Sequence, residues 1–187
     1  TGFRNAVDMA IAPDGTVYVL NRSYEQRPDG VHVTICSLDE EYITEFGAYG
    51  EGDGEFIWPT AVVLDSKGDV YVADEWLNRI TKFTKDGEYI GKWGTAGAGD
   101  GELNGPSGLA IDSSGNIVLV DSKNNRIQKF TPDGKFISKF GSAGSGDGEF
   151  NLPWGIALDE DDNIYITDWR NDRVQVFDFD GVWQQSF

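Results

Sequence analysis

Two charged residues recur together along the chain at a fixed interval. Asp74, Asp121 and Asp168 stand 47 residues apart, and an arginine follows each of them five residues later. A carboxylate and a guanidinium at that spacing can pair across the connection between two strands, and the carboxylate can also accept backbone N–H groups. Because the pair is repeated, we interpret it as a structural clamp and not as a reactive centre. The arginines are Arg79, Arg126 and Arg173.

An Asp-Gly-Glu triplet is a second repeated acidic feature, at residues 53–55, 100–102 and 147–149. The triplet lacks the alternating oxygen donors of a calcium-binding loop. No helix follows it, so it does not form a phosphate-binding loop. The glycines before it indicate a link with unusual backbone angles. We therefore interpret the triplet, too, as structural.

The repeat itself predicts the elements that must position these residues. In the copy at 103–149, apolar or β-branched runs at 108–112, 117–121, 126–130 and 135–140 are separated by turns that contain glycine or Asp-Gly. No stretch has helical periodicity. Four short strands in a period of about 40–50 residues are typical of a propeller blade. We predict an all-β propeller of four-stranded antiparallel blades, forming a single repeat domain over residues 1–187, with approximate blades at 3–55, 56–102, 103–149 and 150–187.

Four motifs recur within the copies. They are Pro-Trp-Gly-Ile-Ala-Leu-Asp at 153–159, Asn-Ile-Tyr-Ile-Thr-Asp at 163–168, Arg-Val-Gln-Val-Phe at 173–177, and Phe-Gly at 140–141. This set resembles the NHL-repeat family over the whole chain, most clearly from 56 to 187. The resemblance implies a β-propeller. It leaves function open, because such propellers serve both as binding platforms and as metal-dependent lyases and lactonases.

The two ends of the chain fall at one register of the repeat, since Phe3 aligns with Phe56 and Phe150, and Phe187 aligns with Phe140. The resemblance implies rings of six blades more often than four, so we expect an arc of a longer propeller, with a compact four-bladed ring as the alternative. An arc exposes an apolar blade face at each end, and we expect self-association or closure of the two ends. The exposed rows are Val7, Met9 and Ile11 at one end and Val174, Val176 and Phe177 at the other.

The charge balance excludes one class of partner. Fifteen Lys and Arg against 32 Asp and Glu give a net charge of −17, and the acids are spread through turns and links. Nucleic-acid binding needs a basic surface, so we expect no nucleic-acid partner. No apolar run of 18 residues is present, which predicts a soluble protein without membrane insertion; the trimmed ends leave its compartment unknown. The single cysteine, Cys36, cannot form an internal disulfide and is expected to be a buried apolar residue.

Residues that vary between copies gather on one predicted face. The connections from the second to the third strand and from the fourth strand to the next blade share that face, and they carry four of the six tryptophans. Exposed aromatic rings beside charged residues are typical of protein-binding hot spots and of sugar-stacking surfaces. Alternatively, the rings pack between blades. The candidate partner-binding residues are Tyr24, Glu25, Arg27, Trp58, Glu75, Trp76, Trp154, Trp169 and Arg170.

The first repeat departs from the others and carries Asp8 where the later copies have Ala61, Gly108 and Gly155. A carboxylate at the mouth of a central channel can bind a cation such as Ca²⁺ or Zn²⁺, or can simply face channel water. The only histidine, His32, falls in a third strand, away from the channel. We expect a non-catalytic scaffold without a cofactor that binds a protein, peptide or glycan. The alternative is a metal-dependent propeller enzyme, lactonase-like or lyase-like, with channel ligands largely outside this chain.

Overall fold

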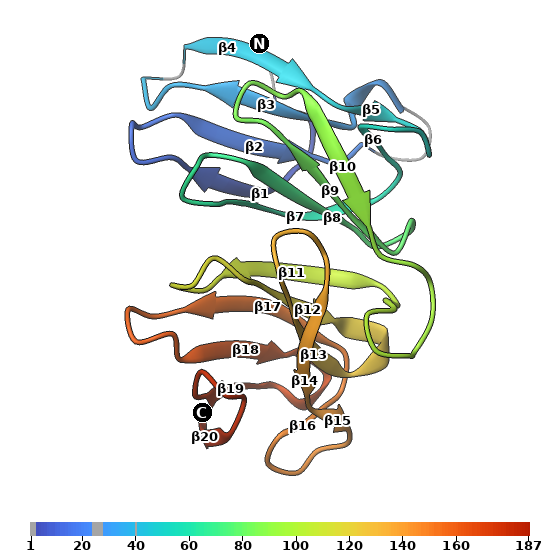
Figure 1. The fold of residues 1–187 in the computed structure, drawn as a ribbon, viewed down its shortest axis with the longest axis vertical. Coiled ribbons are helices and arrows are strands. Elements are labelled where there is room, and N and C mark those ends of the chain that lie inside the picture. Colours follow the sequence, from blue (N-terminus) through green and yellow to red (C-terminus); the bar gives the residue numbers. More distant parts are fainter. Residues whose placement is uncertain (1–2, 24–27, 40) are drawn as a thin grey trace. The chain divides into compact units, whose positions relative to one another are not determined.

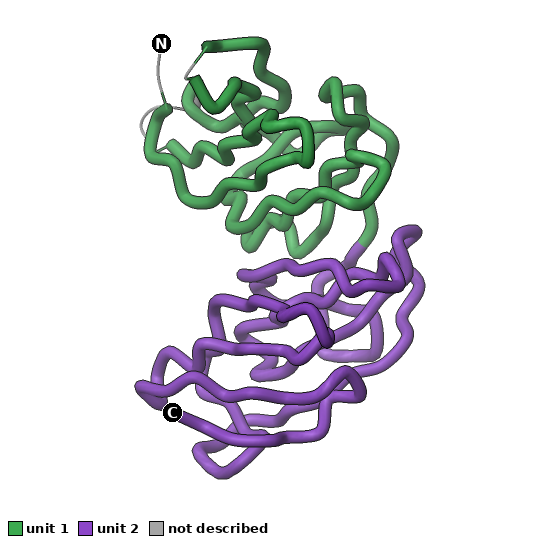
Figure 2. The backbone as a smooth tube through the Cα atoms, turned by 90° about the vertical axis from the view of Figure 1, so that its left-hand side faces the viewer, with its two compact units in different colours: residues 1–93 green, residues 94–187 purple. Residues whose placement is uncertain are grey.

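The structure is a computed structural model that describes residues 3–23, 28–39 and 41–187. It divides into two compact units, Thr1–Trp93 and Gly94–Phe187 (Figure 2). Each unit contains two blades, and each blade is a four-stranded antiparallel sheet whose strands lie side by side in sequence order (Figure 1). The predicted fold class, an all-β propeller built of four blades, is confirmed. The single domain over 1–187 stays a prediction.

Unit 1 contains blades 1 and 2. Blade 1 consists of β1 (Ala6–Ile11), β2 (Val17–Asn21), β3 (His32–Cys36) and β4 (Tyr42–Phe46), with the short 3-10 helix η1 (Pro28–Gly30) before β3. Blade 2 consists of β7 (Pro59–Leu64), β8 (Val70–Asp74), β9 (Arg79–Phe83) and β10 (Tyr89–Trp93). The link between the two blades forms a two-stranded parallel ladder of β5 (Ala48–Tyr49) and β6 (Glu55–Phe56).

Unit 2 repeats this plan in blades 3 and 4. Blade 3 consists of β11 (Pro106–Ile111), β12 (Ile117–Asp121), β13 (Arg126–Phe130) and β14 (Phe136–Phe140), with η2 (Ser122–Asn124) between its second and third strands. Blade 4 consists of β17 (Pro153–Leu158), β18 (Ile164–Asp168), β19 (Arg173–Phe177) and β20 (Trp183–Ser186), with η3 (Trp169–Asn171) in the same place. The link between them pairs β15 (Ser142–Ala143) with β16 (Glu149–Phe150).

Alternation along the second strand decides which neighbour each residue meets. Successive side chains of a strand point to opposite faces of its sheet. In unit 2, Val118 and Val120 of β12 belong to one buried cluster with Ile164 and Ile166 of β18. In unit 1, Tyr18 and Leu20 of β2 similarly pack with Val62, Val70 and Val72 of blade 2. Each blade therefore has one face for the preceding blade and one for the following blade. The expected exposure of Val176 and Phe177 is wrong, because both are buried and Phe177 packs in the cluster that joins blades 3 and 4.

The repeated Asp–Arg pair forms the predicted clamp in blade 3. The Asp121 carboxylate is fully buried and accepts hydrogen bonds from the Asn104 N–H (2.6 Å), Asn124 Nδ2 (2.9 Å), Arg126 Nε (2.7 Å) and Gln128 Nε2 (3.0 Å). The other guanidinium nitrogens of Arg126 donate to the carbonyls of residues 98, 99 and 102 in the preceding link. One arginine thus joins the carboxylate to the glycine-rich link.

Blade 4 contains the same clamp, but blade 2 does not. In blade 4, Arg173 Nε lies 2.9 Å from the Asp168 carboxylate. In blade 2, Arg79 still donates to link carbonyls, yet among the described residues its Nε has no hydrogen-bond partner. The predicted ion pair between Asp74 and Arg79 is therefore wrong. Both carboxylate oxygens of Asp74 are instead occupied by four backbone N–H groups, those of Ile57, Trp58, Trp76 and Leu77.

The glutamate of each Asp-Gly-Glu triplet closes the glycine-rich link onto itself. Oε2 of Glu55 accepts the Gly52 N–H at 2.7 Å, and Glu102 and Glu149 make the same bond in their own links. The aspartates Asp53 and Asp100 pair with Lys92 and Lys139, each on the fourth strand of the blade that follows the link. These contacts agree with the structural interpretation of the triplet.

Replacing Arg126 with alanine tests the clamp. Asp121 would lose its charged partner while remaining buried, so we expect Arg126→Ala to lower the free energy of unfolding by about 1–3 kcal/mol. Lys135→Ala, at an exposed position of the same blade, should change it by less than about 0.5 kcal/mol. Chemical denaturation monitored by tryptophan fluorescence measures both. Equal midpoints for the two variants would contradict the clamp.

The two glycines near the start of the inner strands of unit 2 differ in how closely they are packed. A Cβ at Gly108 would lie 2.8 Å from the Trp154 carbonyl oxygen, whereas a Cβ at Gly155 would meet only the Thr167 side chain, at 3.1 Å. Because backbone cannot yield as a side chain can, we expect Gly108→Val to cost about 1–3 kcal/mol and Gly155→Val to cost less. Thermal unfolding of both variants checks the order, and the reverse order would contradict this strand packing.

Candidate functional site

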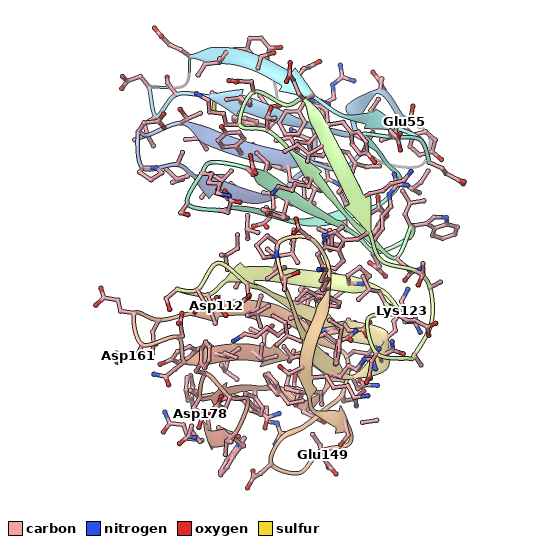
Figure 3. The ribbon with its side chains drawn as sticks, in the orientation of Figure 1. Glu55, Asp112, Lys123, Glu149, Asp161 and Asp178 are labelled. Carbon is pink, nitrogen blue, oxygen red and sulfur yellow. The ribbon has the colours of Figure 1, made fainter. Side chains whose placement is uncertain are left out.

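Two sets of loops meet at one end of each blade of unit 2. Asn124 Nδ2 donates to the Gly97 carbonyl at 2.8 Å, and Asn171 Nδ2 donates to the Gly144 carbonyl at 2.9 Å. These bonds join the connection after the second strand to the link that leads into the blade. Figure 3 shows Lys123 and Glu149 on one side of the unit, and the hairpin residues Asp112, Asp161 and Asp178 on the opposite side. The predicted sharing of one loop face is confirmed for unit 2.

A pocket of about 360 Å³ opens at this face of blade 4 and is lined by Trp154, Thr167 and Trp169. The two indoles are 42% and 57% exposed, so their rings are accessible to a partner. The lining is almost entirely apolar. The hydroxyl oxygen of Thr167 accepts the Gly155 N–H at 2.7 Å. The pocket therefore offers two aromatic surfaces and one oriented hydroxyl group.

An irregular strand start positions Trp154. The pairing of β17 with β18 shifts register between Pro153 and Ile156, as in a β-bulge. The Trp154 carbonyl accepts the Ser107 hydroxyl at 2.8 Å, which ties the bulge to blade 3. Just before it, Leu152 has a φ of 53°, a left-handed conformation that costs a branched residue about 1 kcal/mol, and its N–H donates to Asn125 Oδ1 at 2.8 Å. The surrounding structure thus holds a strained backbone beside Trp154.

The other indole stands on the short helix η3. Asp168, fully buried at the end of β18, accepts hydrogen bonds from the Asn151 N–H and from Nδ2 of Asn171, the last residue of η3, so it ties η3 to the link that precedes blade 4. The guanidinium carbon of Arg170 lies 4.9 Å from the centroid of the Trp169 ring. That distance is within the range of a cation–π contact. Arg170 therefore covers part of Trp169 and adds a positive charge at the pocket's edge.

The remaining predicted partner-binding residues lie in unit 1 or outside the described residues. Trp58 is half-buried, and the guanidinium carbon of Arg22 lies 4.2 Å from the centroid of its ring. Trp76 is 70% exposed and Glu75 is half-buried. Their roles in binding stay predictions. Tyr24, Glu25 and Arg27, from the enlarged loop of the first repeat, lie outside the residues that the structure describes.

Asp8 joins blade 1 to blade 2. Its carboxylate accepts the N–H of Val62 on the inner strand of blade 2 at 2.8 Å and its neighbour Met9's N–H at 2.9 Å. Burial raises the pKa of Asp8, and the two N–H bonds partly oppose that effect. Within the described ranges, no three His, Cys, Asp or Glu side chains gather as a metal site would require. His32 begins β3, as predicted, and burial lowers its pKa.

The sequence alone did not identify Thr167 or Leu152. Thr167 was detectable in principle, because Leu20, Ala73 and Val120 occupy the same position of the repeat and only blade 4 has a hydroxyl there. Leu152 aligns with Gly105, whose φ is 65°. The sequence did carry a signal of backbone strain here, because the preceding copy has a glycine where this copy has Leu152. Cys36 is buried and unbridged, as expected.

Comparison with protein-family models identifies repeats in this chain. The model described as NHL repeat matches residues 56–83 and 103–130, and the model described as 6-bladed beta-propeller matches residues 117–186. No curated protein matches the chain by sequence. No helix among the described residues is long and apolar enough to cross a membrane.

Solved structures share the fold at low sequence identity. A streptogramin B lyase matches all of this chain over 55% of its own length, with a TM-score of 0.72 and 17% identity. A Bacteroides thetaiotaomicron VPI-5482 protein of unknown function matches 99% of the chain over 48% of its own length, with a TM-score of 0.74 and 24% identity. Hydrazine synthase from Kuenenia stuttgartiensis matches all of the chain over 49% of its own length, with a TM-score of 0.71 and 16% identity.

The chain thus spans about half the length of each of these structures, and at such identities the likeness extends to the fold alone. The repeat motifs, the matching family models and the four-stranded blades agree with one another. The chain carries NHL repeats and has the β-propeller fold.

Proposed function

We propose that this chain is a non-catalytic binding module that holds a protein, peptide or glycan partner in the Trp154–Trp169 pocket of blade 4. The observation that carries the proposal is the pocket of about 360 Å³, in which two exposed indoles flank the Thr167 hydroxyl. Tryptophan is over-represented among the residues that dominate binding energy at interfaces. An indole face also stacks on the apolar face of a sugar ring.

The construction of the pocket supports this function. Large exposed indoles are costly to keep in water, and here a bulge, a strained Leu152 and a buried Asp168 hold two of them in fixed positions. Strained backbone persists where the surrounding structure determines it, and it is concentrated at binding sites. A rigid pocket also lowers the entropic cost of ordering side chains when a partner binds.

The net charge of the chain further restricts the class of partner. With a net charge of −17, the protein repels polyanions at a distance, attracts basic partners and does not disfavour neutral ones. Arg170 places one local positive charge at the pocket. We therefore favour neutral glycans and neutral or basic peptides over anionic ligands.

Truncation of the pocket indoles tests the proposal on printed peptide and glycan arrays probed with labelled protein. We expect Trp154→Ala and Trp169→Ala to lose the wild-type array signals, each by tenfold or more, since hot-spot residues contribute about 2 kcal/mol or more. Their melting temperatures should stay close to that of the wild type, because both rings are exposed. Tyr42→Ala, 58% exposed on the outer strand of blade 1, is the matched control and should keep the signals. Signals that survive both tryptophan changes, or no signal from the wild type, would refute the proposal.

A metal titration separates this function from the enzyme alternative. If Asp8 contributed to a channel metal site, Ca²⁺ or Zn²⁺ at a hundredfold excess over Kd would stabilise the fold by about 2.7 kcal/mol. Because the Asp8 carboxylate already accepts two N–H groups, we expect no shift of the melting temperature with either ion. Two results together would favour the enzyme: a metal-induced rise of the melting temperature that Asp8→Asn removes, and array signals that the tryptophan changes leave intact.

A further inference from the structure

A buried glutamine completes the clamps of blades 3 and 4. Gln128 is fully buried, and its Oε1 accepts the N–H of Gly101 in the preceding link at 3.0 Å. Its Nε2 donates to the Glu102 carbonyl at 2.8 Å and to the Asp121 carboxylate at 3.0 Å. Gln175 makes the corresponding three bonds in blade 4. The side-chain amide therefore serves both as an acceptor and as a donor between the clamp and its link.

Blade 2 has the same link geometry as blade 3. Arg79 donates to three link carbonyls, and each of these bonds has its counterpart in a bond that Arg126 makes. Gly54 has a φ of 75° and Gly101 a φ of 81°, so the two links share their backbone conformation at this glycine. The glycine N–H and the glutamate carbonyl that bind the glutamine amide in blade 3 are therefore presented in the same way by Gly54 and Glu55.

The residue at the glutamine position of blade 2 is Thr81. It occupies the same register between the second and fourth strands as Gln128 does, and it is fully buried. Phe83, on the same face of β9, packs on Phe56 of the link with 5.7 Å between the ring centroids. The Thr81 side chain therefore faces the link, but it ends at the γ position and has no amide with which to bridge the clamp and the link.

Two buried polar atoms of this clamp have no hydrogen-bond partner among the residues that the structure describes. They are Nε of Arg79, a residue that is 8% exposed, and Oγ1 of Thr81. The Asp74 carboxylate does not serve Nε, because it already accepts four backbone N–H groups. A buried donor or hydroxyl without a partner costs about as much free energy as a lost hydrogen bond. Both atoms therefore require a bridging polar group.

We propose that blade 2 binds one internal water molecule where blades 3 and 4 have the glutamine amide. The water accepts hydrogen bonds from Arg79 Nε and the Gly54 N–H, and it donates to the Glu55 carbonyl and to Thr81 Oγ1. Buried waters typically make about three bonds to polar groups that would otherwise be unsatisfied. This site lies inside blade 2, so it is separate from the binding module proposed for blade 4.

The mixture of donors and acceptors around the site identifies the ligand as water. Arg79 and Gly54 present N–H donors and Glu55 presents a carbonyl, so the ligand must both accept and donate, as the glutamine amide does. A chloride ion cannot donate, and it would lie close to the buried Asp74 carboxylate. A metal or ammonium cation cannot accept, and it would face the Arg79 guanidinium. Water meets both requirements and is small enough to replace the end of a side chain.

A crystal structure of the 187-residue protein, at a resolution that shows ordered water, tests the inference directly. We expect one ordered water within hydrogen-bond distance of both Arg79 Nε and Thr81 Oγ1. Blade 3 is the internal control, because the Gln128 amide should occupy the equivalent place there. A direct hydrogen bond between Arg79 Nε and Asp74 would overturn the inference. An anomalous signal at the site after chloride is replaced by bromide would identify a halide and would overturn it as well.

Exchanging the two residue types between the blades tests the site by thermal unfolding. Thr81→Gln should supply the amide, displace the water and raise the melting temperature by about 2–4 °C, the shift that one net hydrogen bond gives in a chain of this length. Thr81→Val keeps the shape of threonine without its hydroxyl and should lower the melting temperature. Gln128→Thr should also lower it and admit a water to blade 3. A Thr81→Gln variant that melts no higher than Thr81→Val would show that the site has no room for the amide, against the inference.

Discussion

The structure depends on one constraint, that a blade is a sheet with two faces and must bury both against neighbouring sheets. The second strands show how the sequence meets this constraint. Val118 and Val120 face the following blade, and Ile164 and Ile166 face the preceding one, so that a single buried cluster joins the two sheets of unit 2. The sheets are antiparallel hairpin meanders whose tight turns hold the four strands of a blade together. The same packing leaves an open face wherever a blade has no neighbour.

The loop ends of the blades meet a different requirement, the satisfaction of backbone groups in glycine-rich links. Arg126 and Arg173 each bind link carbonyls and a buried aspartate, so each guanidinium serves two segments at once. In blade 2, Arg79 still binds the link carbonyls, and four backbone N–H groups satisfy the Asp74 carboxylate in place of the guanidinium. The guanidinium of a repeated Asp–Arg pair can thus be replaced by main-chain donors while the carboxylate stays buried. This rigid base supports the aromatic residues on the loop face of unit 2.

The proposed binding pocket lies at repeat positions that make the contact between successive blades in the other blade pairs. Where a blade pair meets, the following inner strand covers the second strand and the short helix beyond it. In blade 4 these positions carry Thr167 and Trp169, which line the pocket together with Trp154 of the inner strand.

The sequence by itself determined the period, the four-stranded blades, the burial of Cys36 and the clamps of blades 3 and 4, because strand alternation and turn residues are local signals. It also placed Trp154 and Trp169 on the loop face. Only the tertiary structure decided that these two indoles share a pocket with Thr167, that Asp8 is bonded to Val62, and that Arg79 leaves Asp74 to backbone donors. Such outcomes depend on which N–H groups, carboxylates and rings come within contact distance across a blade or between blades. These residues lie far apart in the sequence, so no local sequence pattern indicates which of them meet.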